Sequence, residues 1–187
     1  MPFVNSLVDA LQCIYIERGG SKEARDRIVQ TIMDRQNSIE VDNSGFAPVC
    51  IFAEATTTNG TRIIPFKRGA FSAMRTVTPS FFSITSGQIS PTYDIIDLIP
   101  LQFLLISSLY FRWAKITILP DFTPNAWMLE KYADKGREPW EIYAWCVREV
   151  ISKYSGIQVL DEKLSLKDKL AFENLMNGRD DRVEING

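Results

Sequence analysis

The sequence predicts an α/β domain with a mixed, largely parallel sheet flanked by helices. Short apolar runs rich in β-branched and aromatic residues alternate along the chain with segments of helical periodicity. Such alternation of strands with helices is typical of α/β domains. The length of 187 residues is that of one ordinary domain with a substantial core. We expect this domain to cover residues 1–160, and residues 161–187 to form a C-terminal helix and a polar tail.

The individual elements follow from the spacing of apolar residues. Helical spacing predicts helices over residues 4–12, 21–36, 139–154 and 165–176, with one helical turn at 127–132. Ser21 is a typical N-cap, and Pro139 suits the first turn of a helix. Compact or alternating apolar runs predict buried strands over residues 13–16 and 48–52, and further strands over residues 76–84 and 112–119. Residues 95–111 predict a short strand followed by a core helix, because Asp97, Pro100 and Gln102 leave too short an apolar run to span a bilayer.

The composition excludes several classes of function. A net charge of −2 gives no support for nucleic acid as a partner. The chain contains no histidine, so it holds no Ser-His-Asp or Cys-His nucleophile system, no imidazole base and no His-ligated metal. The three cysteines, Cys13, Cys50 and Cys146, lack the spacing of a zinc site or a disulfide framework. We therefore expect no metal, and three buried, reduced cysteines in a reducing compartment.

A candidate binding site follows two of the predicted strands. Arg18 lies just after the first strand, Glu54 and Thr56 lie after the second, and Lys67 lies farther along the same loop. Because ligands of parallel α/β sheets bind at the carboxyl ends of the strands, we expect these four residues to converge. Arginine binds phosphate through two parallel hydrogen bonds, and threonine hydroxyls donate to further oxygens. Each residue alone is more often a solvated charge or part of a polar turn than a ligand-binding group, but together they predict a site for an anionic, oxygen-rich ligand.

The same segments resemble the PlsC-type glycerolipid acyltransferase family. Residues 11–18 resemble its apolar strand ending in an acid and an arginine, and residues 52–56 resemble its Phe-Pro-Glu-Gly-Thr motif. Residues 65–71 resemble the Phe-Lys-x-Gly-Ala-Phe continuation of that motif. Segments farther on resemble the family's proline-containing strand and the tail of its lysophosphatidylcholine acyltransferase branch, at residues 77–79, 118–120, 140 and 155–157. Two departures are Ala53 and Ala55, which stand where the family has proline and glycine.

The resemblance implies transfer of an acyl group from acyl-CoA, as co-substrate, to a lysophospholipid, with no further cofactor. Arg18, Glu54, Thr56 and Lys67 would then hold the glycerophosphate of the acceptor. It also implies a membrane-associated protein of the endoplasmic reticulum or mitochondrial membrane, with phospholipid, acyl-CoA and the membrane surface as partners.

The family's catalytic base is the histidine of a His-x-x-x-x-Asp motif that precedes the arginine motif, and this sequence has no histidine. We therefore expect the acyltransferase-like domain to be N-terminally incomplete, with no catalytic residue in this chain and no activity from it alone. Two interpretations stay open beside an unrelated anion-binding α/β module. One is an acyltransferase whose base comes from other sequence. The other is a pseudoenzyme that acts as a structural or lipid-binding subunit of a larger membrane assembly.

Overall fold

The fold is taken from a computed structural model of the chain. The structure describes residues 10–14, 21–42, 44–56, 58, 60–85, 113–160, 171 and 174–175. The elements are α2 (Lys22–Glu40), β1 (Arg62–Ile63), the 3-10 helix η1 (Arg68–Ala70), β2 (Ser80–Thr85), β3 (Trp113–Ile118), α4 (Ala126–Lys131), η2 (Ala133–Lys135), α5 (Pro139–Ser155) and β4 (Gln158–Val159). The predictions for residues 4–9, 15–20, 95–111 and most of 161–187 lie outside the described residues.

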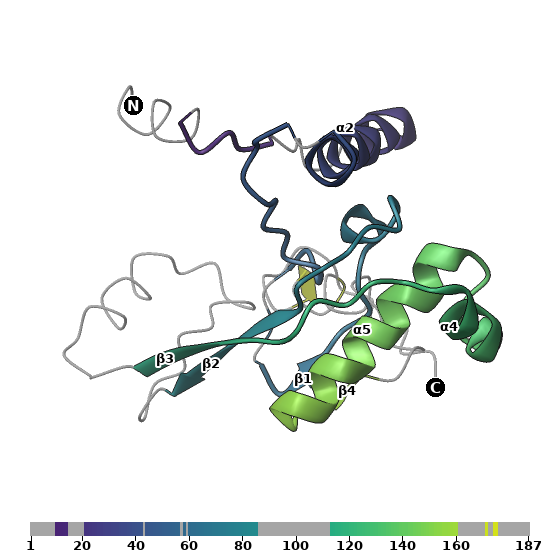
Figure 1. The fold of residues 1–187 in the computed structure, drawn as a ribbon. Coiled ribbons are helices and arrows are strands. Elements are labelled where there is room, and N and C mark those ends of the chain that lie inside the picture. Colours follow the sequence, from purple (N-terminus) through teal and green to yellow (C-terminus); the bar gives the residue numbers. More distant parts are fainter. Residues whose placement is uncertain are drawn as a thin grey trace.

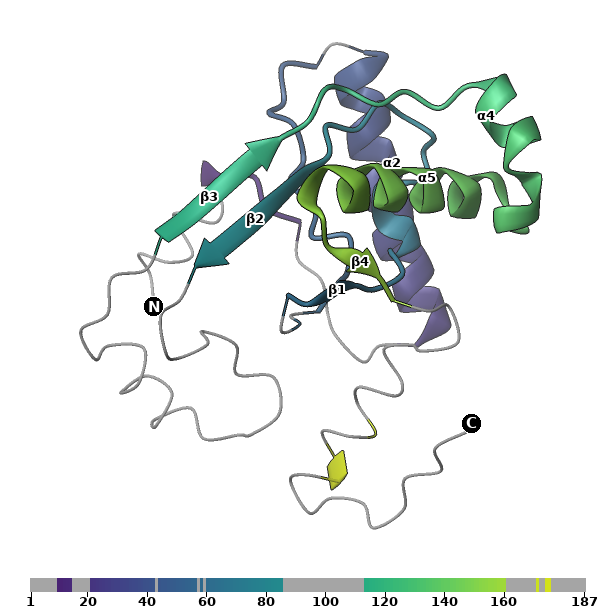
Figure 2. The same ribbon diagram turned by 90° about the horizontal axis from the view of Figure 1, so that it is seen from below.

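The predicted mixed α/β class is confirmed. Strand β1 pairs in parallel with β4, and β2 pairs antiparallel with β3. In both views the β2–β3 ribbon extends away from the helices, and the end where β2 finishes and β3 begins lies farthest from them (Figure 1 and Figure 2). The domain boundary after residue 160 stays a prediction.

The two longest described helices begin where the sequence predicts. The Ser21 hydroxyl accepts from the Ala24 amide at 3.3 Å and caps α2, which continues past the predicted end to Glu40. Helix α5 has Pro139 in its first turn and a capping box between Glu138 and Glu141. It ends at Gly156, whose φ of 73° is the left-handed conformation that favours glycine at this position. The helical turn predicted at 127–132 is α4.

The strand predictions at 76–84 and 112–119 are correct, and the prediction at 48–52 is wrong. Residues 44–52 form an irregular segment, and Phe52 is largely exposed. Cys13 and Ile14 are irregular as well. Neither apolar run has a partner strand among the described residues, and without a partner a run of β-formers gains no ladder hydrogen bonds. The two-residue strands β1 and β4 are too short to produce a periodic signal.

The β2–β3 ribbon confirms the strands predicted at 76–84 and 112–119. Its register pairs Ser80 with Ile118 and continues to the pair of Thr85 and Trp113. The regular ladder stops at Pro79, which has no amide hydrogen and contributes only its carbonyl, accepting from Leu119 at 2.8 Å. One further bridge, between Val77 and Phe122, continues the pairing beyond this point.

The core is built around α5, and Tyr143 is its most buried large side chain. Its neighbours in the core are Ile63, Phe71, Leu119, Met128, Ile142, Ala144, Cys146, Val147 and Ile151. The Tyr143 ring packs edge-on against Phe71 and stacks on Phe122, with centroid distances of 5.3 and 5.9 Å. Its hydroxyl lies 2.9 Å from the Arg75 carbonyl oxygen and 2.7 Å from that of Phe122. Burial raises the pKa of this hydroxyl, so it stays a neutral donor.

The cysteines are all free, as the sequence predicts, but only one of them is buried. Cys146 lies in the core, and desolvation, with a smaller contribution from the Glu149 charge, raises its pKa to about 11. Cys13 and Cys50 are exposed, so the expectation of burial is wrong for both. The reason is that their apolar runs are not core strands.

Replacing Tyr143 by phenylalanine tests the importance of its hydroxyl. The Tyr143→Phe variant removes the one O–H proton that the Arg75 and Phe122 carbonyls share, so we expect a loss of about 1–3 kcal/mol in the free energy of unfolding. Urea denaturation followed by circular dichroism measures the loss. The control is Tyr154→Phe on the exposed side of the same helix, which should change stability by less than about 0.5 kcal/mol. Equal stability of the two variants would contradict the assignment.

Candidate functional site

Three of the four predicted site residues lie on one loop that folds back on itself. The Lys67 amide donates to the Ala53 carbonyl at 2.8 Å. The Ile64 amide donates to the Glu54 carboxylate, Oε1, at 2.9 Å. These two hydrogen bonds close residues 53–67, which we call the acceptor loop, and they bring Lys67 next to the segment that holds Glu54 and Thr56. Arg18 lies outside the described residues, so its convergence with the loop stays a prediction.

The loop is held in place by β1 rather than by the predicted strand at 48–52. Ile63 is buried in the core, and β1 pairs in parallel with β4 through Arg62 and Gln158, and Ile63 and Val159. The Leu160 amide extends this pairing with a bond to the Ile63 carbonyl at 2.8 Å. The sequence gives no signal for β1, because two residues cannot show a periodicity. Ile63 and Ile64 are therefore the positioning residues that sequence reasoning missed.

Glu54 has a structural role in the loop. Its carboxylate is half-buried and receives the Ile64 amide ten residues later, which fixes the loop's width. A carboxylate accepts hydrogen bonds only, and this one holds the loop closed. Its negative charge makes it unsuitable for direct contact with phosphate.

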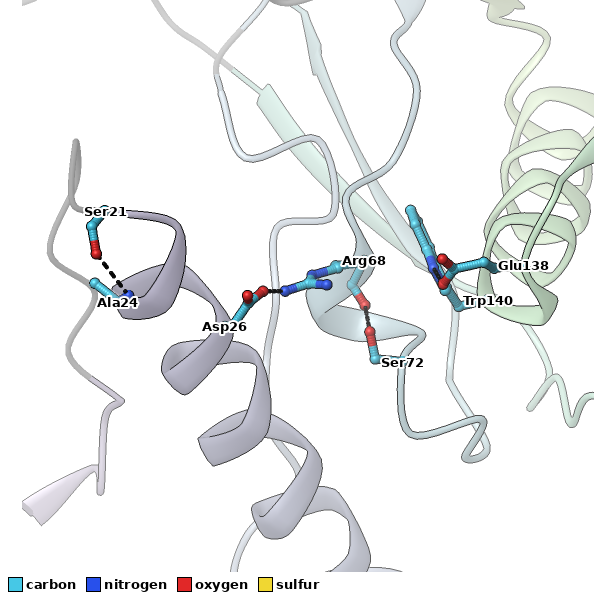
Figure 3. A network of polar contacts seen from close by, with 7 residues as sticks. All are labelled: Ser21, Ala24, Asp26, Arg68, Ser72, Glu138 and Trp140. Carbon is cyan, nitrogen blue, oxygen red and sulfur yellow. Dashed lines mark hydrogen bonds and ion pairs between the residues drawn. The ribbon is translucent and has the colours of Figure 1, made fainter.

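The structure separates the basic residues that cluster in the sequence between Arg62 and Arg75. The Arg68 guanidinium forms an ion pair with Asp26 of α2, and the Ser72 hydroxyl donates to the Arg68 carbonyl at 2.9 Å (Figure 3). Arg75 donates through Nε to the Asn37 side chain at 2.8 Å. Both arginines thus attach the segment that follows the loop to α2. Figure 3 also shows Trp140 donating to Glu138 at the start of α5, at 2.8 Å.

Lys67 differs from these two arginines. It is exposed, and among the residues that the structure describes no carboxylate lies within ion-pair distance of its ammonium. A cation that is not already paired can attract an anionic ligand without first losing a protein partner. Of the predicted binding residues in the described part of the chain, Lys67 is therefore the one best suited to an anion.

Ala55 occupies a backbone conformation that favours glycine. Its φ is 56°, and its amide donates to the Phe52 carbonyl at 3.0 Å in the turn that opens the acceptor loop. A residue with a Cβ in the left-handed region costs about 1–2 kcal/mol relative to the right-handed one. The family pattern has glycine at this position, and glycine adopts this positive φ without strain. Alanine adopts the same conformation here at the cost of strain.

The described residues contain no cluster of three or more His, Cys, Asp or Glu side chains that could hold a metal ion. No described helix is both long enough and apolar enough to cross a bilayer.

Comparisons with known proteins point to one family. Residues 1–91, which include the acceptor loop, match the family model described as Acyltransferase. A lysophosphatidylcholine acyltransferase of Drosophila melanogaster is 30% identical over 163 residues, 86% of this chain and 28% of the relative. The lysophospholipid acyltransferase LPEAT1 of Arabidopsis thaliana is 26% identical over 179 residues, 95% of this chain and 42% of the relative. The human lysophosphatidylcholine acyltransferase 1 is 26% identical over 162 residues, 86% of this chain and 28% of the relative.

These relatives are longer than the present chain, which spans between 28% and 42% of their lengths. No solved structure matches the chain. The family match covers the loop and the motifs at residues 11–18, 52–56, 65–71 and 77–79, and the relatives extend the similarity through α5 to most of the chain. The chain therefore belongs to the acyltransferase family, on the branch that contains the lysophosphatidylcholine and lysophospholipid acyltransferases.

Proposed function

We propose that this chain binds the acceptor of a lysophospholipid acyltransferase. The acceptor loop would hold the glycerophosphate, with Lys67 and Arg18 on the phosphate, Thr56 donating to a further oxygen and Glu54 accepting from a hydroxyl. The observation that supports the proposal is the closed loop, in which the Lys67 amide bonds to the Ala53 carbonyl and the Ile64 amide bonds to the Glu54 carboxylate. Family membership and the names of the relatives supply the reaction class and the class of acceptor.

The chemistry of acyl transfer defines what this chain supplies and what it lacks. The acceptor hydroxyl attacks the thioester carbonyl of acyl-CoA, the new ester bond forms, and the CoA thiol leaves. No cofactor beyond this co-substrate is required. The hydroxyl proton must pass to a base, which typically contributes a factor of 10²–10⁴ to the rate. The chain has no histidine, and Glu54 is engaged by a backbone amide. We therefore propose that the base comes from sequence outside this chain.

A second candidate is a catalytically inactive, lipid-binding subunit of a membrane assembly. The absence of histidine and the strained Ala55 both favour it, since an inactive relative need not retain the best geometry for its substrate. Both candidates are membrane-associated and bind the same acceptor. They differ only in whether a complete active site forms when the missing base is supplied.

An acyl-transfer assay tests the proposal that this chain lacks the catalytic base of an acyltransferase. The purified chain is incubated with radiolabelled acyl-CoA and a lysophospholipid, and the labelled phospholipid is separated by chromatography. We expect no product above the uncatalysed background, because no imidazole is present to take the proton. Turnover that survives both Glu54→Ala and Arg18→Ala would contradict the inactivity and the motif assignment together.

Binding of the acceptor is tested separately from turnover. Lys67→Ala should weaken the binding of a soluble, short-chain lysophospholipid about 10-fold, the effect of losing one charge-assisted hydrogen bond. Isothermal titration calorimetry gives the dissociation constants. The matched control is Lys153→Ala, an exposed lysine in the last turn of α5, which should leave the affinity unchanged. If Lys67→Ala has the affinity of the control, the loop is not the phosphate site. An unchanged affinity in Arg18→Ala would remove Arg18 from the site.

The strain at Ala55 predicts a stabilising substitution. Ala55→Gly removes the methyl group from a left-handed backbone position, so the free energy of unfolding should rise by up to about 1 kcal/mol. The control is Ala53→Gly, two residues earlier and without a positive φ, which should lower it by about 0.5–1 kcal/mol or more. Thermal and urea denaturation measure both changes. A destabilised Ala55→Gly variant would show that the turn does not hold this conformation in solution.

A further inference from the structure

The β2–β3 ribbon has one face that is both apolar and exposed. The register places Phe82 opposite Ile116, Ile84 opposite Ala114, and Ser80 opposite Ile118, so these side chains share a face. The exposed fractions are 50% for Phe82, 54% for Ile84, 57% for Ile116 and 69% for Ile118. The alternate residues include Phe81, which packs against the core. The face turned away from the core thus carries large apolar side chains that no described residue covers.

Phe52 extends this surface beyond the strands. Its ring centroid is 6.4 Å from that of Phe82, and the residue is 73% exposed. Single exposed apolar residues are ordinary, but contiguous apolar patches larger than a few hundred Å² are rare on monomeric soluble proteins and mark interaction surfaces. A two-stranded ribbon is also only marginally stable in water on its own. We name Phe52, Phe82, Ile84, Ile116 and Ile118 the ribbon face.

The charge around the ribbon face indicates what covers it. Strands β2 and β3 contain no acidic residue and a single cation, Lys115. Phe52 leads directly into the acceptor loop, where the Lys67 amide is bonded to the neighbouring Ala53 carbonyl. An apolar surface without acids therefore adjoins an exposed cation. A phospholipid bilayer has the complementary order, with acyl chains next to a layer of phosphates.

We propose that the ribbon face docks this chain on the surface of a phospholipid bilayer, with its five side chains among the acyl chains and the acceptor loop at the level of the phosphates. This inference rests on the proposed function, since a lysophospholipid dissolved in the bilayer would then present its headgroup to the loop without leaving the membrane. The competing occupant of the face is a second copy of the chain, which a measurement of oligomeric state detects.

Sedimentation of the full chain with phosphatidylcholine vesicles tests the docking. The wild-type chain should sediment with the vesicles. The double variant Ile116→Thr and Ile118→Thr should partition into them at least about 10-fold more weakly, because it removes apolar surface. Threonine is a good strand former, so exposed replacements keep the ribbon. The control is Trp127→Ala on α4, an exposed aromatic residue outside the face, with partitioning within twofold of wild type.

A gained signal gives a second, independent readout. In Phe82→Trp the added indole should be quenched by brominated phospholipids, whereas the indole added by Phe46→Trp, before the acceptor loop, should not be quenched. A wild-type chain that stays in the supernatant, a double variant that partitions like wild type, or a Phe82→Trp signal without quenching would overturn the proposal. Sedimentation velocity could also show a dimer that is lost in the double variant. This result would assign the face to a second copy of the chain and overturn the membrane-docking proposal.

The same variants separate this inference from the proposed function. The double variant should bind the soluble short-chain lysophospholipid with wild-type affinity while it loses vesicle binding. If no form of the chain binds that soluble acceptor, but vesicle binding still depends on Ile116 and Ile118, the acceptor role fails and the docking surface stands. If acceptor binding persists and vesicle binding does not depend on these two residues, the docking surface fails and the acceptor role stands.

Discussion

The buried hydroxyl of Tyr143 joins three parts of the chain that are distant in sequence. It reaches from α5 to the carbonyls of Arg75 and Phe122, which lie before β2 and after β3. The Phe122 carbonyl also accepts from the Val77 amide at 3.0 Å, so one oxygen holds both the helix and the start of the ribbon. Arg75 in turn contacts α2 through Asn37. This one buried hydroxyl therefore links α5 to both ends of the ribbon and, through Arg75, to α2.

The acceptor loop depends on the same core from its other side. Ile63 is buried next to α5, and its backbone pairs with the strand that follows that helix. With this anchor fixed, the Glu54 carboxylate and the Ala53 carbonyl close the loop. Arg68 and Arg75 attach the following segment to α2, whereas Lys67 and Arg62 are exposed and form no ion pair among the described residues. The different roles of these neighbouring basic residues follow from which of them contact α2.

Family membership and catalytic competence rest on different residues in this chain. The residues that hold an acceptor in the family pattern are present, and the loop brings three of them together. The imidazole that removes a proton in that pattern is absent from the sequence. The ribbon face adds a third element, a lipid-compatible surface that begins at Phe52 and so adjoins the loop. In our proposals, substrate holding and membrane docking belong to this chain, and the base for the chemistry belongs to sequence outside it.

The sequence by itself determined the α/β class, the ends of α5, the cap of α2 and the strands of the ribbon. Each of these depends on local signals: a capping residue, a proline in the first turn, or an alternation long enough to count. It also determined the family, since the motif order needs no coordinates. Only the tertiary structure decided that residues 48–52 are not a strand, that Glu54 binds the Ile64 amide and that Arg68 rather than Lys67 is ion-paired with α2. These facts depend on pairing partners far along the chain. Likewise, when both faces of a ribbon carry apolar residues, the sequence does not tell which face packs against the core.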